Sequence, residues 1–373
     1  MLWRNLAVTL LLCGLAARSE GAEPQLWPVP HHGQQWAFID AHGAVRVTGP
    51  FTAAAPFAEG LARVADANGH SGFIDRRGRW RIRPRFEAAR EFQEGLAAVG
   101  IRLADDPPIG TPPWGFIDTT GRVVIAVQFG DVLDFQEGLA AVSGTAYASK
   151  WGFIDHTGGL VIAPQFEAVG SFHGGLARAA TLGADGSYTE GFIDRAGRWA
   201  IAAHFREVQD FSEGLAAVSP QGEACGYVDA GGQLRIAARF VRCGAFHGGL
   251  AHVETAQGHA FVDPQGQLVL PGPFRDAGDF NGGLAPVAEG RDTWRFMDTH
   301  GMVLLHAAHV GVPRREVLPL VAAGPYDGAL APAWTQGESG REALWLDRQG
   351  LVVWRFRPDL APPGTASITP PHR

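Results

Sequence analysis

The stretch Trp151-Gly-Phe-Ile-Asp-His-Thr-Gly-Gly-Leu-Val-Ile-Ala-Pro-Gln-Phe166, followed by Phe172-His-Gly-Gly-Leu-Ala177, decides how this chain folds, because versions of it recur along most of the sequence. A period in this range is typical of a supersecondary unit that stacks on copies of itself. The sequence therefore predicts one repeat array over residues 22–357. The aspartate of the phrase returns every 34 to 49 residues, at Asp40, Asp75, Asp118, Asp155, Asp194, Asp229, Asp263, Asp298 and Asp347.

The first seven units keep a constant spacing from this aspartate. They have apolar residues at +5 and +7, Phe at +11 and +17, Gly at +20 and Leu at +21. The register fails after Asp298, where His309 stands at +11. Such constancy predicts a packed unit whose two phenylalanines fill the seam between neighbouring units.

All nine units contain Asp-x-x-Gly, which is the chemistry of a tight turn: Asp accepts bonds from turn amides and Gly takes the positive φ. The aspartates thus have a structural role rather than a catalytic or calcium-binding one. Strands are predicted before the turn, as at Phe73-Ile74, after it, as at 80–82, and at Leu-Ala-x-Val, as at 96–99. Together these three strands make an antiparallel meander.

A lone meander with one apolar face is barely stable in water, so stacking must build the core. The predicted fold is all-β, a tandem array of about nine three-stranded meanders that is open and superhelical or solenoid-like. The alternative is a closed β-propeller-like ring, which usually has about four strands per blade. Three strands per unit and the irregular last units favour the open form.

The ends of the chain differ from the array. Residues 1–21 begin with one arginine and continue into the apolar run 6–17, which predicts a signal peptide. No later apolar run has the length of a transmembrane segment. Residues 358–373 contain five prolines and predict a disordered tail.

Charge and cysteine content limit the function. The net charge is −7 and Lys150 is the only lysine, so the chain does not present a basic nucleic-acid surface. Without the leader, Cys225 and Cys243 are the only cysteines. They form either a disulfide in an oxidising compartment or two small apolar core positions, because sequence does not supply the geometry of a bridge.

Length variation is concentrated between Leu-Ala-x-Val and the next Gly-Phe-Ile-Asp, in the segments 101–113, 143–150 and 181–190. Loops on one side of a repeat scaffold are a usual place for binding. The predicted ligand-facing residues in these loops are Asp105, Asp106, Tyr147, Lys150 and Tyr188.

Motifs for hydrolysis, nucleotide binding, zinc or redox chemistry are absent from the sequence. The glutamates Glu59, Glu94, Glu137 and Glu213 share one register beside a turn glycine and are interpreted as solvated turn residues. Identical groups in a row make a poor active site, because acid–base catalysis needs paired groups in different environments. The sequence therefore predicts a protein that is not an enzyme, with no cofactor and no metal.

Trp-Gly-Phe-Ile-Asp-x-x-Gly-x-x-Val-Ile-x-Pro-x-Phe, followed by Phe-x-x-Gly-Leu-Ala-x-Val, resembles the WG repeat family of bacterial proteins, most fully at Trp114 and Trp151. The resemblance covers roughly residues 26–356 and implies an all-β repeat scaffold that acts as a binding module, with no agreed catalytic residues. Most units lack the tryptophan, and the eighth and ninth depart from the pattern.

The leader, the regular scaffold and the missing catalytic motifs together predict a periplasmic or secreted binding protein. Its expected partner is another protein of the bacterial envelope. The alternative is binding of a carbohydrate or peptidoglycan through exposed aromatic residues such as Tyr147 and Tyr188. An envelope hydrolase with an unconventional site is a third hypothesis.

Overall fold

The computed structural model describes residues 24–32, 35–102, 111–145, 149–183, 186–220, 222, 224–290, 293–305, 308–309, 320–337 and 340–357. Every regular element within them is a β-strand. Accordingly, these residues include no helix with the length and apolar character that a membrane crossing requires. The predicted signal peptide at 1–21 and the predicted tail at 358–373 lie outside the described residues.

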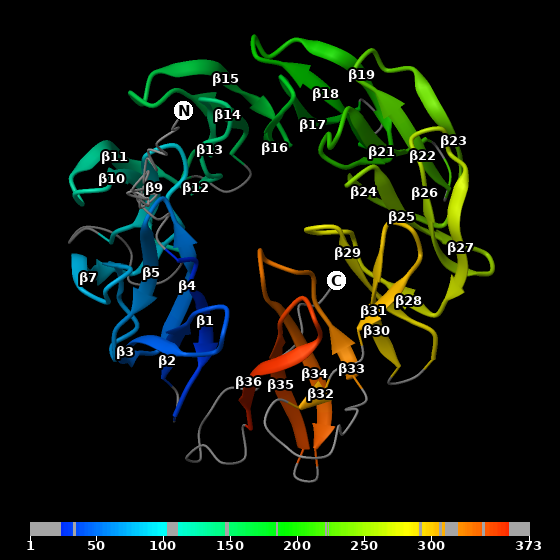
Figure 1. Cartoon of the computed structure of the whole chain (residues 1–373). Coiled ribbons are helices and arrows are strands. Elements are labelled where there is room, and N and C mark those ends of the chain that lie inside the picture. The colour runs from blue at the N-terminus through cyan, green and yellow to red at the C-terminus, as the bar shows by residue number, and fades with distance from the viewer. Residues whose placement is uncertain are drawn as a thin grey trace, which may run out of the picture.

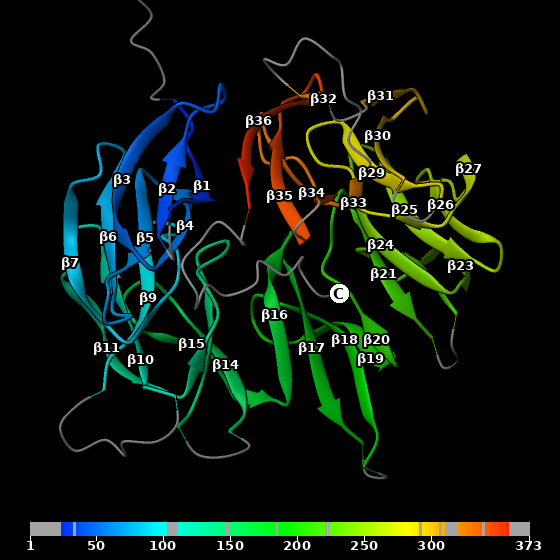
Figure 2. The same cartoon turned by 90° about the horizontal axis from the view of Figure 1, so that it is seen from below.

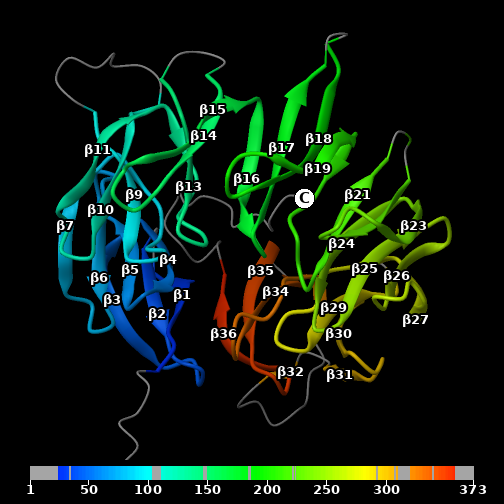
Figure 3. The same cartoon turned by 90° about the horizontal axis from the view of Figure 1, so that it is seen from above.

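The strands form nine sheets in chain order, and the sheets stand as blades around a common axis. Figure 1 looks along this axis, and Figures 2 and 3 show the ring after a turn of 90°. The all-β array of nine repeated units is confirmed. Its architecture is the closed ring stated above as the alternative: the chain is a nine-bladed β-propeller. The preferred open superhelical array is wrong, because blade 9 packs against blade 1.

Within a blade, strands run outward from the axis in chain order. The inner strands are β4 (Ala53–Ala58), β8 (Ala88–Ala89), β12 (Asp131–Val132), β16 (Ala168–His173), β20 (Glu207–Val208), β24 (Arg242–His247), β28 (Asp276–Ala277) and β33 (Leu320–Ala323). The second strands are β1 (Trp27–Pro30), β5 (Leu61–Ala65), β9 (Leu96–Gly100), β13 (Ala140–Ser143), β17 (Leu176–Leu182), β21 (Leu215–Ser219), β25 (Leu250–Thr255), β29 (Leu284–Ala288) and β34 (Ala331–Gly337).

The third strands are β2 (Trp36–Ile39), β6 (Ser71–Asp75), β10 (Trp114–Asp118), β14 (Trp151–Ile154), β18 (Tyr188–Asp194), β22 (Cys225–Asp229), β26 (Gly258–Val262), β30 (Trp294–Asp298) and β35 (Gly340–Leu346). The outer strands are β3 (Val45–Phe51), β7 (Trp80–Phe86), β11 (Val123–Phe129), β15 (Leu160–Phe166), β19 (Trp199–Phe205), β23 (Leu234–Phe240), β27 (Leu268–Phe274), β31 (Val303–Leu305) and β36 (Leu351–Phe356). Blade 9 has a fifth strand, β32 (Ala308–His309), beside β36.

The three predicted strands of a unit are the second, third and outer strands, and the structure adds an inner strand to blades 2 to 9. In blades 2 to 8 this strand comes from the segment between +11 and +20, for which the sequence predicts only a link. Four of the eight inner strands, β8, β12, β20 and β28, have just two residues. A strand this short has no period-two pattern, so the prediction missed it.

The Asp-x-x-Gly turn joins the third and outer strands in the way the sequence predicts. In Asp155, one carboxylate oxygen accepts hydrogen bonds from the backbone N–H groups of Thr157 and Gly159 and from the Thr157 hydroxyl, at 2.6–2.9 Å. The hydroxyl bond is the main reason that the pKa of the Asp155 carboxyl lies below its usual range, and the two amide bonds lower it further. The turn glycine Gly158 has φ +82°, a conformation that side chains with a Cβ rarely adopt.

The core lies between blades. The phenylalanine at +17 packs against the aromatic residue of the preceding blade's third strand, as Phe172 does against Phe153 in a T-shaped contact with 4.9 Å between ring centroids. Seven such pairs follow one another around the ring, and Tyr326 forms an eighth with Phe296, with centroid separations of 4.7–5.0 Å. The predicted sealing role of the +17 residue therefore agrees with the structure.

Blade 9 closes the ring on blade 1 through side chains. The indole N–H of Trp27 donates to the carbonyl of Asp327 at 2.8 Å, and that of Trp354 donates to the carbonyl of Pro30 at 3.2 Å. Trp27, Val29, Ala37 and Ile39 of blade 1 share an apolar cluster with Leu330 of blade 9. These contacts join segments about 300 residues apart in the chain.

A chain of glutamates links the turns between inner and second strands. Glu59, Glu94, Glu137 and Glu213 have φ of 50–52°, and each reaches the same turn of the next blade. Their carboxylates accept hydrogen bonds from the backbone amides of Gly95, Gly138, Gly175 and Gly249, at 2.8–2.9 Å. The glutamates are turn residues that remain at least partly exposed, as predicted, and the structure adds that each one joins two blades.

Candidate functional site

A pocket of about 1120 Å³ lies at the inner strands of blades 6 to 9 and is called the axial pocket here. Residues of β20, β24, β28 and β33 form much of its wall, so it faces the axis of the ring. The side chains that determine its chemistry are Arg206, Arg242, His252, Asp279, Trp294 and Trp334.

Arginines stand at matching corners of three successive blades in this wall. Arg206 and Arg275 occupy +12 of their units, and Arg242 occupies +13. Arg242 forms an ion pair with Glu254 at 3.3 Å, whereas Arg206 and Arg275 are exposed and have no side-chain partner among the described residues. The two unpaired guanidinium groups can therefore donate to a ligand.

Asp279 contributes a carboxylate that is largely withdrawn from water. Its Oδ1 is buried and accepts no hydrogen bond within the described part of the chain. Burial raises the pKa of the Asp279 carboxyl, although nearby His247 opposes the change. Gly244 makes room for it, since a Cβ there would come within 2.5 Å of Oδ1.

Two histidines of blade 7 form a pair in the wall. Nε2 of His252 lies 2.7 Å from Nδ1 of His259, and their rings stack with 4.9 Å between centroids. One ring must hold the shared hydrogen and the other must accept it. The pair therefore orients both imidazoles.

Two tryptophans provide apolar surface next to these polar groups. Trp334 of blade 9 is 6% exposed, and its Nε1 is buried without a hydrogen-bond acceptor in the described residues. Trp294 is half-buried and packs against the apolar cluster of blade 9. A buried indole N–H usually has a partner, so Trp334 is a second unsatisfied polar group on the pocket wall.

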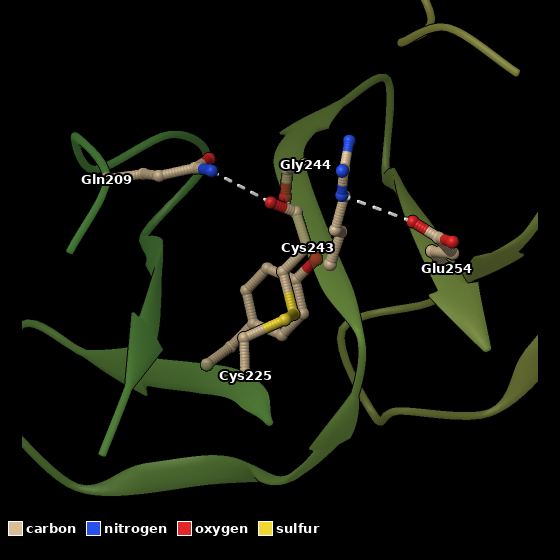
Figure 4. Close-up of a disulfide and its surroundings, with 7 residues drawn as sticks. Gln209, Cys225, Cys243, Gly244 and Glu254 are labelled. Atoms are coloured by element: carbon tan, nitrogen blue, oxygen red, sulfur yellow. Dashed lines mark hydrogen bonds and ion pairs between the residues drawn. A yellow bond between two sulfur atoms is a disulfide. The ribbon is translucent and has the colours of Figure 1, made fainter. Parts of the chain in front are cut away.

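A disulfide joins Cys225 of β22 to Cys243 of β24, and both residues line the axial pocket. Figure 4 shows the bridge, with the Gln209 side chain donating to the carbonyl of Cys243 at 2.9 Å. The cysteines belong to one sequence unit but to adjacent blades, because the outer strand of a unit leads directly into the inner strand of the next blade. The bridge therefore ties blade 6 to blade 7.

The two predicted loop residues that the structure describes, Lys150 and Tyr188, do not line this pocket. Asp105, Asp106 and Tyr147 lie outside the described residues. Lys150 forms an ion pair with Glu167 in blade 4. Tyr188 is 61% exposed on β18 of blade 5, in a segment that extends the β17–β18 hairpin rather than forming an open loop.

Sequence reasoning missed the axial pocket, although its acidic residue has a signature. The +16 position is acidic at Glu91, Asp134, Asp210 and Asp279. Two of these acids meet an arginine from the second strand of the preceding blade, in the pairs Arg63–Glu91 and Arg178–Asp210, both at 3.1 Å. Asp279 faces a blade with His252 at the corresponding position, so its inter-blade arginine is missing.

The axial pocket combines arginine donors, one buried carboxyl and an indole donor with apolar walls, which suits recognition of a polar ligand. No cluster of three or more His, Cys, Asp or Glu residues in the described ranges has the geometry to hold a metal ion.

Comparison with solved structures supports the fold. A structure titled "Crystal structure of the eukaryotic initiation factor" superposes with a TM-score of 0.60 at 10% identity, covering 90% of this chain and 96% of the other. Apo AztD from Citrobacter koseri gives a TM-score of 0.37 at 14% identity, covering 87% and 91%. At these identities the first likeness concerns the fold alone, and the second carries no argument. The curated proteins contain no significant sequence match.

The model of the WG containing repeat matches seven segments, at residues 36–68, 72–101, 114–143, 151–180, 191–222, 226–255 and 260–290. These segments cover more than half of the chain and follow the blades in order. The chain belongs to the WG-containing repeat family.

Proposed function

We propose that this chain is a non-enzymatic binding scaffold of the bacterial envelope that holds a partner protein at the axial pocket. One observation carries the proposal: Asp279 Oδ1 and Trp334 Nε1 are both buried in the wall of one pocket, and neither has a partner among the described residues. A buried polar atom without a hydrogen bond costs about 1–3 kcal/mol. A ligand that displaces the covering side chains, and supplies a donor to Asp279 and an acceptor to Trp334, recovers that energy.

Export to the envelope is part of the proposal. Its support is the apolar leader at 1–21 and the disulfide between Cys225 and Cys243, since structural disulfides persist in oxidising compartments. Fractionation of cells that express the full-length chain tests this point. Recovery of the shortened, oxidised protein from the periplasm or medium is expected, and an uncleaved cytoplasmic protein contradicts it.

The partner is tested by placing a photo-crosslinking amino acid at Ala322 in the pocket wall, with Leu234 on the outer rim as the control position. A partner that is captured in cells from Ala322 and not from Leu234 is then purified and titrated against Trp334→Phe and Asp279→Asn. Each substitution is expected to weaken binding by about tenfold. Equal capture from both positions, or unchanged affinity in both variants, contradicts the proposal.

Tyr188 supports a second candidate, the binding of a glycan or peptidoglycan. Its ring is 61% exposed on the β17–β18 hairpin, away from the axial pocket. Retention of the protein on purified peptidoglycan, lost in Tyr188→Ala and kept in Trp334→Phe, favours this candidate. Equal retention of wild type and Tyr188→Ala excludes it.

A further inference from the structure

The outer edge of blade 3 has a backbone that is open for pairing. β11 is the last strand in the order β11-β10-β9-β8, and no strand of the described part of the chain pairs with its other edge. Figure 1 places β11 on the rim of the ring, far from the axial pocket. Exposed strand edges are templates for pairing with another polypeptide.

β11 also lacks the residues that usually protect an edge. Proteins blunt exposed edges with charged side chains and proline. Among the seven-residue outer strands, β3, β7 and β23 contain arginine, and β15 and β27 contain proline. Only β11, Val-Val-Ile-Ala-Val-Gln-Phe, and β19 contain neither. In β19, three of the seven residues are alanine, which favours strands less than valine does.

The side chains on this edge leave apolar surface in water. Val123 and Val124 are each 43% exposed. Phe129, at the other end of β11, is only half-buried, whereas its equivalents Phe86 and Phe166 are at most 3% exposed. β11 therefore combines an unpaired backbone with uncovered β-branched residues.

In blade 9 the outer edge of the sheet is paired with a further strand. β32 pairs in parallel with the outer strand β36, through Ala308 with Leu351 and His309 with Val352. Val352 stands at +5, the position of Val123 in blade 3, and is 8% exposed rather than 43%. This propeller thus accepts a fifth strand at that register, whereas Val352 itself packs in the apolar core with Leu320 and Leu344.

We propose that β11 binds an extended, apolar segment of a partner polypeptide as a fifth strand, parallel to β11 and in the register of β32 on β36. The proposal rests on the role of the chain as a protein-binding scaffold and specifies a second surface and the chemistry of the segment that it takes. The paired part of that segment is uncharged, rich in β-branched residues and free of proline, because main-chain hydrogen bonds give such pairing its affinity. A second copy of this chain fits less well, since two edges related by a two-fold axis normal to the sheet pair in antiparallel fashion.

The test uses the full-length chain and a fluorescent peptide, Lys-Val-Thr-Val-Thr-Val-Thr-Lys, as the probe. The control peptide has the same side chains but carries N-methyl groups on alternate amides. These groups remove the hydrogen-bond donors that strand pairing needs. Val124→Lys introduces a charge on the β11 edge. The matched control is Val269→Lys, at the same +6 position of β27, where the wild-type side chain is 44% exposed.

The parent peptide is expected to bind wild type and Val269→Lys alike, and Val124→Lys about tenfold or more weakly. The N-methylated peptide is expected to bind none of them. Equal binding to both lysine variants, or no binding to wild type, overturns the proposal. So does a wild-type dimer that Val124→Lys dissociates in sedimentation, because the edge then belongs to a second copy. Capture of a partner from Ala322 tests the axial pocket separately, so either idea can fail without the other.

Discussion

The carboxylate of Glu137 in blade 4 binds the backbone amide of Gly175 in blade 5 at 2.9 Å, and its other oxygen binds the amide of Gly174 at 2.6 Å. The glutamate does so from a left-handed backbone with φ +51°. Residues with a Cβ pay roughly 1–2 kcal/mol for that conformation. An inter-blade hydrogen bond therefore offsets a local strain.

This relationship predicts an order of stabilities at position 137. Glu137→Ala removes the carboxylate and keeps the strain, so it should lower the free energy of unfolding by about 1–2 kcal/mol, a value reduced for partial exposure. Glu137→Gly also removes the carboxylate but relieves the strain, and should be less damaging. Urea unfolding checks the order, and an alanine variant as stable as wild type contradicts it.

The aromatic seam predicts a larger loss. Phe172 is fully buried against Phe153, so Phe172→Ala should cost about 3–5 kcal/mol. The exposed Tyr188, replaced by alanine, is the control and should change stability by less than about 0.5 kcal/mol. Thermal melts of both variants make the comparison. Similar melting temperatures for the two variants would contradict a stabilising role for the aromatic contacts between blades.

The disulfide predicts a redox-dependent stability. Cys225 and Cys243 are 18 residues apart, and closing a loop of that size is worth about 3 kcal/mol in the chain-entropy model. The double variant Cys225→Ser, Cys243→Ser should be less stable than the oxidised wild type by about that amount. With a reductant the wild type should approach the variant, whereas a melting temperature insensitive to reductant would mean that the bridge does not form.

Two aspartates should respond to pH with opposite signs. The pKa of Asp155 is lowered, so its stabilisation is present above about pH 4 and is lost as the pH falls through the folded-state value. The pKa of Asp279 is raised by burial, so its favourable protonated form is lost as the pH rises through the folded-state value. At pH 7, Asp155→Asn should lower the melting temperature and Asp279→Asn should raise it. Changes of the same sign would contradict the assigned environments.

The sequence predicted those parts of the fold that depend on local chemistry. Asp155 and Gly158 specify a turn whatever the tertiary arrangement of the blades. Phe172 must be buried against a neighbouring unit in an open array and in a closed ring alike. The inner strand was missed because a two-residue strand such as β12 has no period of its own and exists only by pairing with β13. Ring closure was only the alternative prediction, because it depends on the angle between blades and on contacts of long range such as that of Trp27 with Asp327.

The axial pocket was missed for the same reason as the inner strands that form its wall. The loops at 101–113 and 143–150 were singled out because their lengths vary, whereas Asp279 stands at a constant position of its unit and was not considered. Its signal is a missing partner, which it shares with Asp134: Asp210 faces Arg178 from the preceding blade, whereas Asp279 and Asp134 have no such arginine. That signal can be read only after the pairing of blades is known.

Small-angle X-ray scattering of the full-length chain tests whether blade 9 closes on blade 1. A closed ring predicts a compact, disc-like particle with a radius of gyration near that of a globular protein of this size, about 20 Å. Trp27→Ala combined with Trp354→Ala, which removes both closing indoles, should broaden the pair-distance distribution. An elongated wild-type profile with a radius of gyration far above that value, unchanged in the double variant, would contradict the closed propeller.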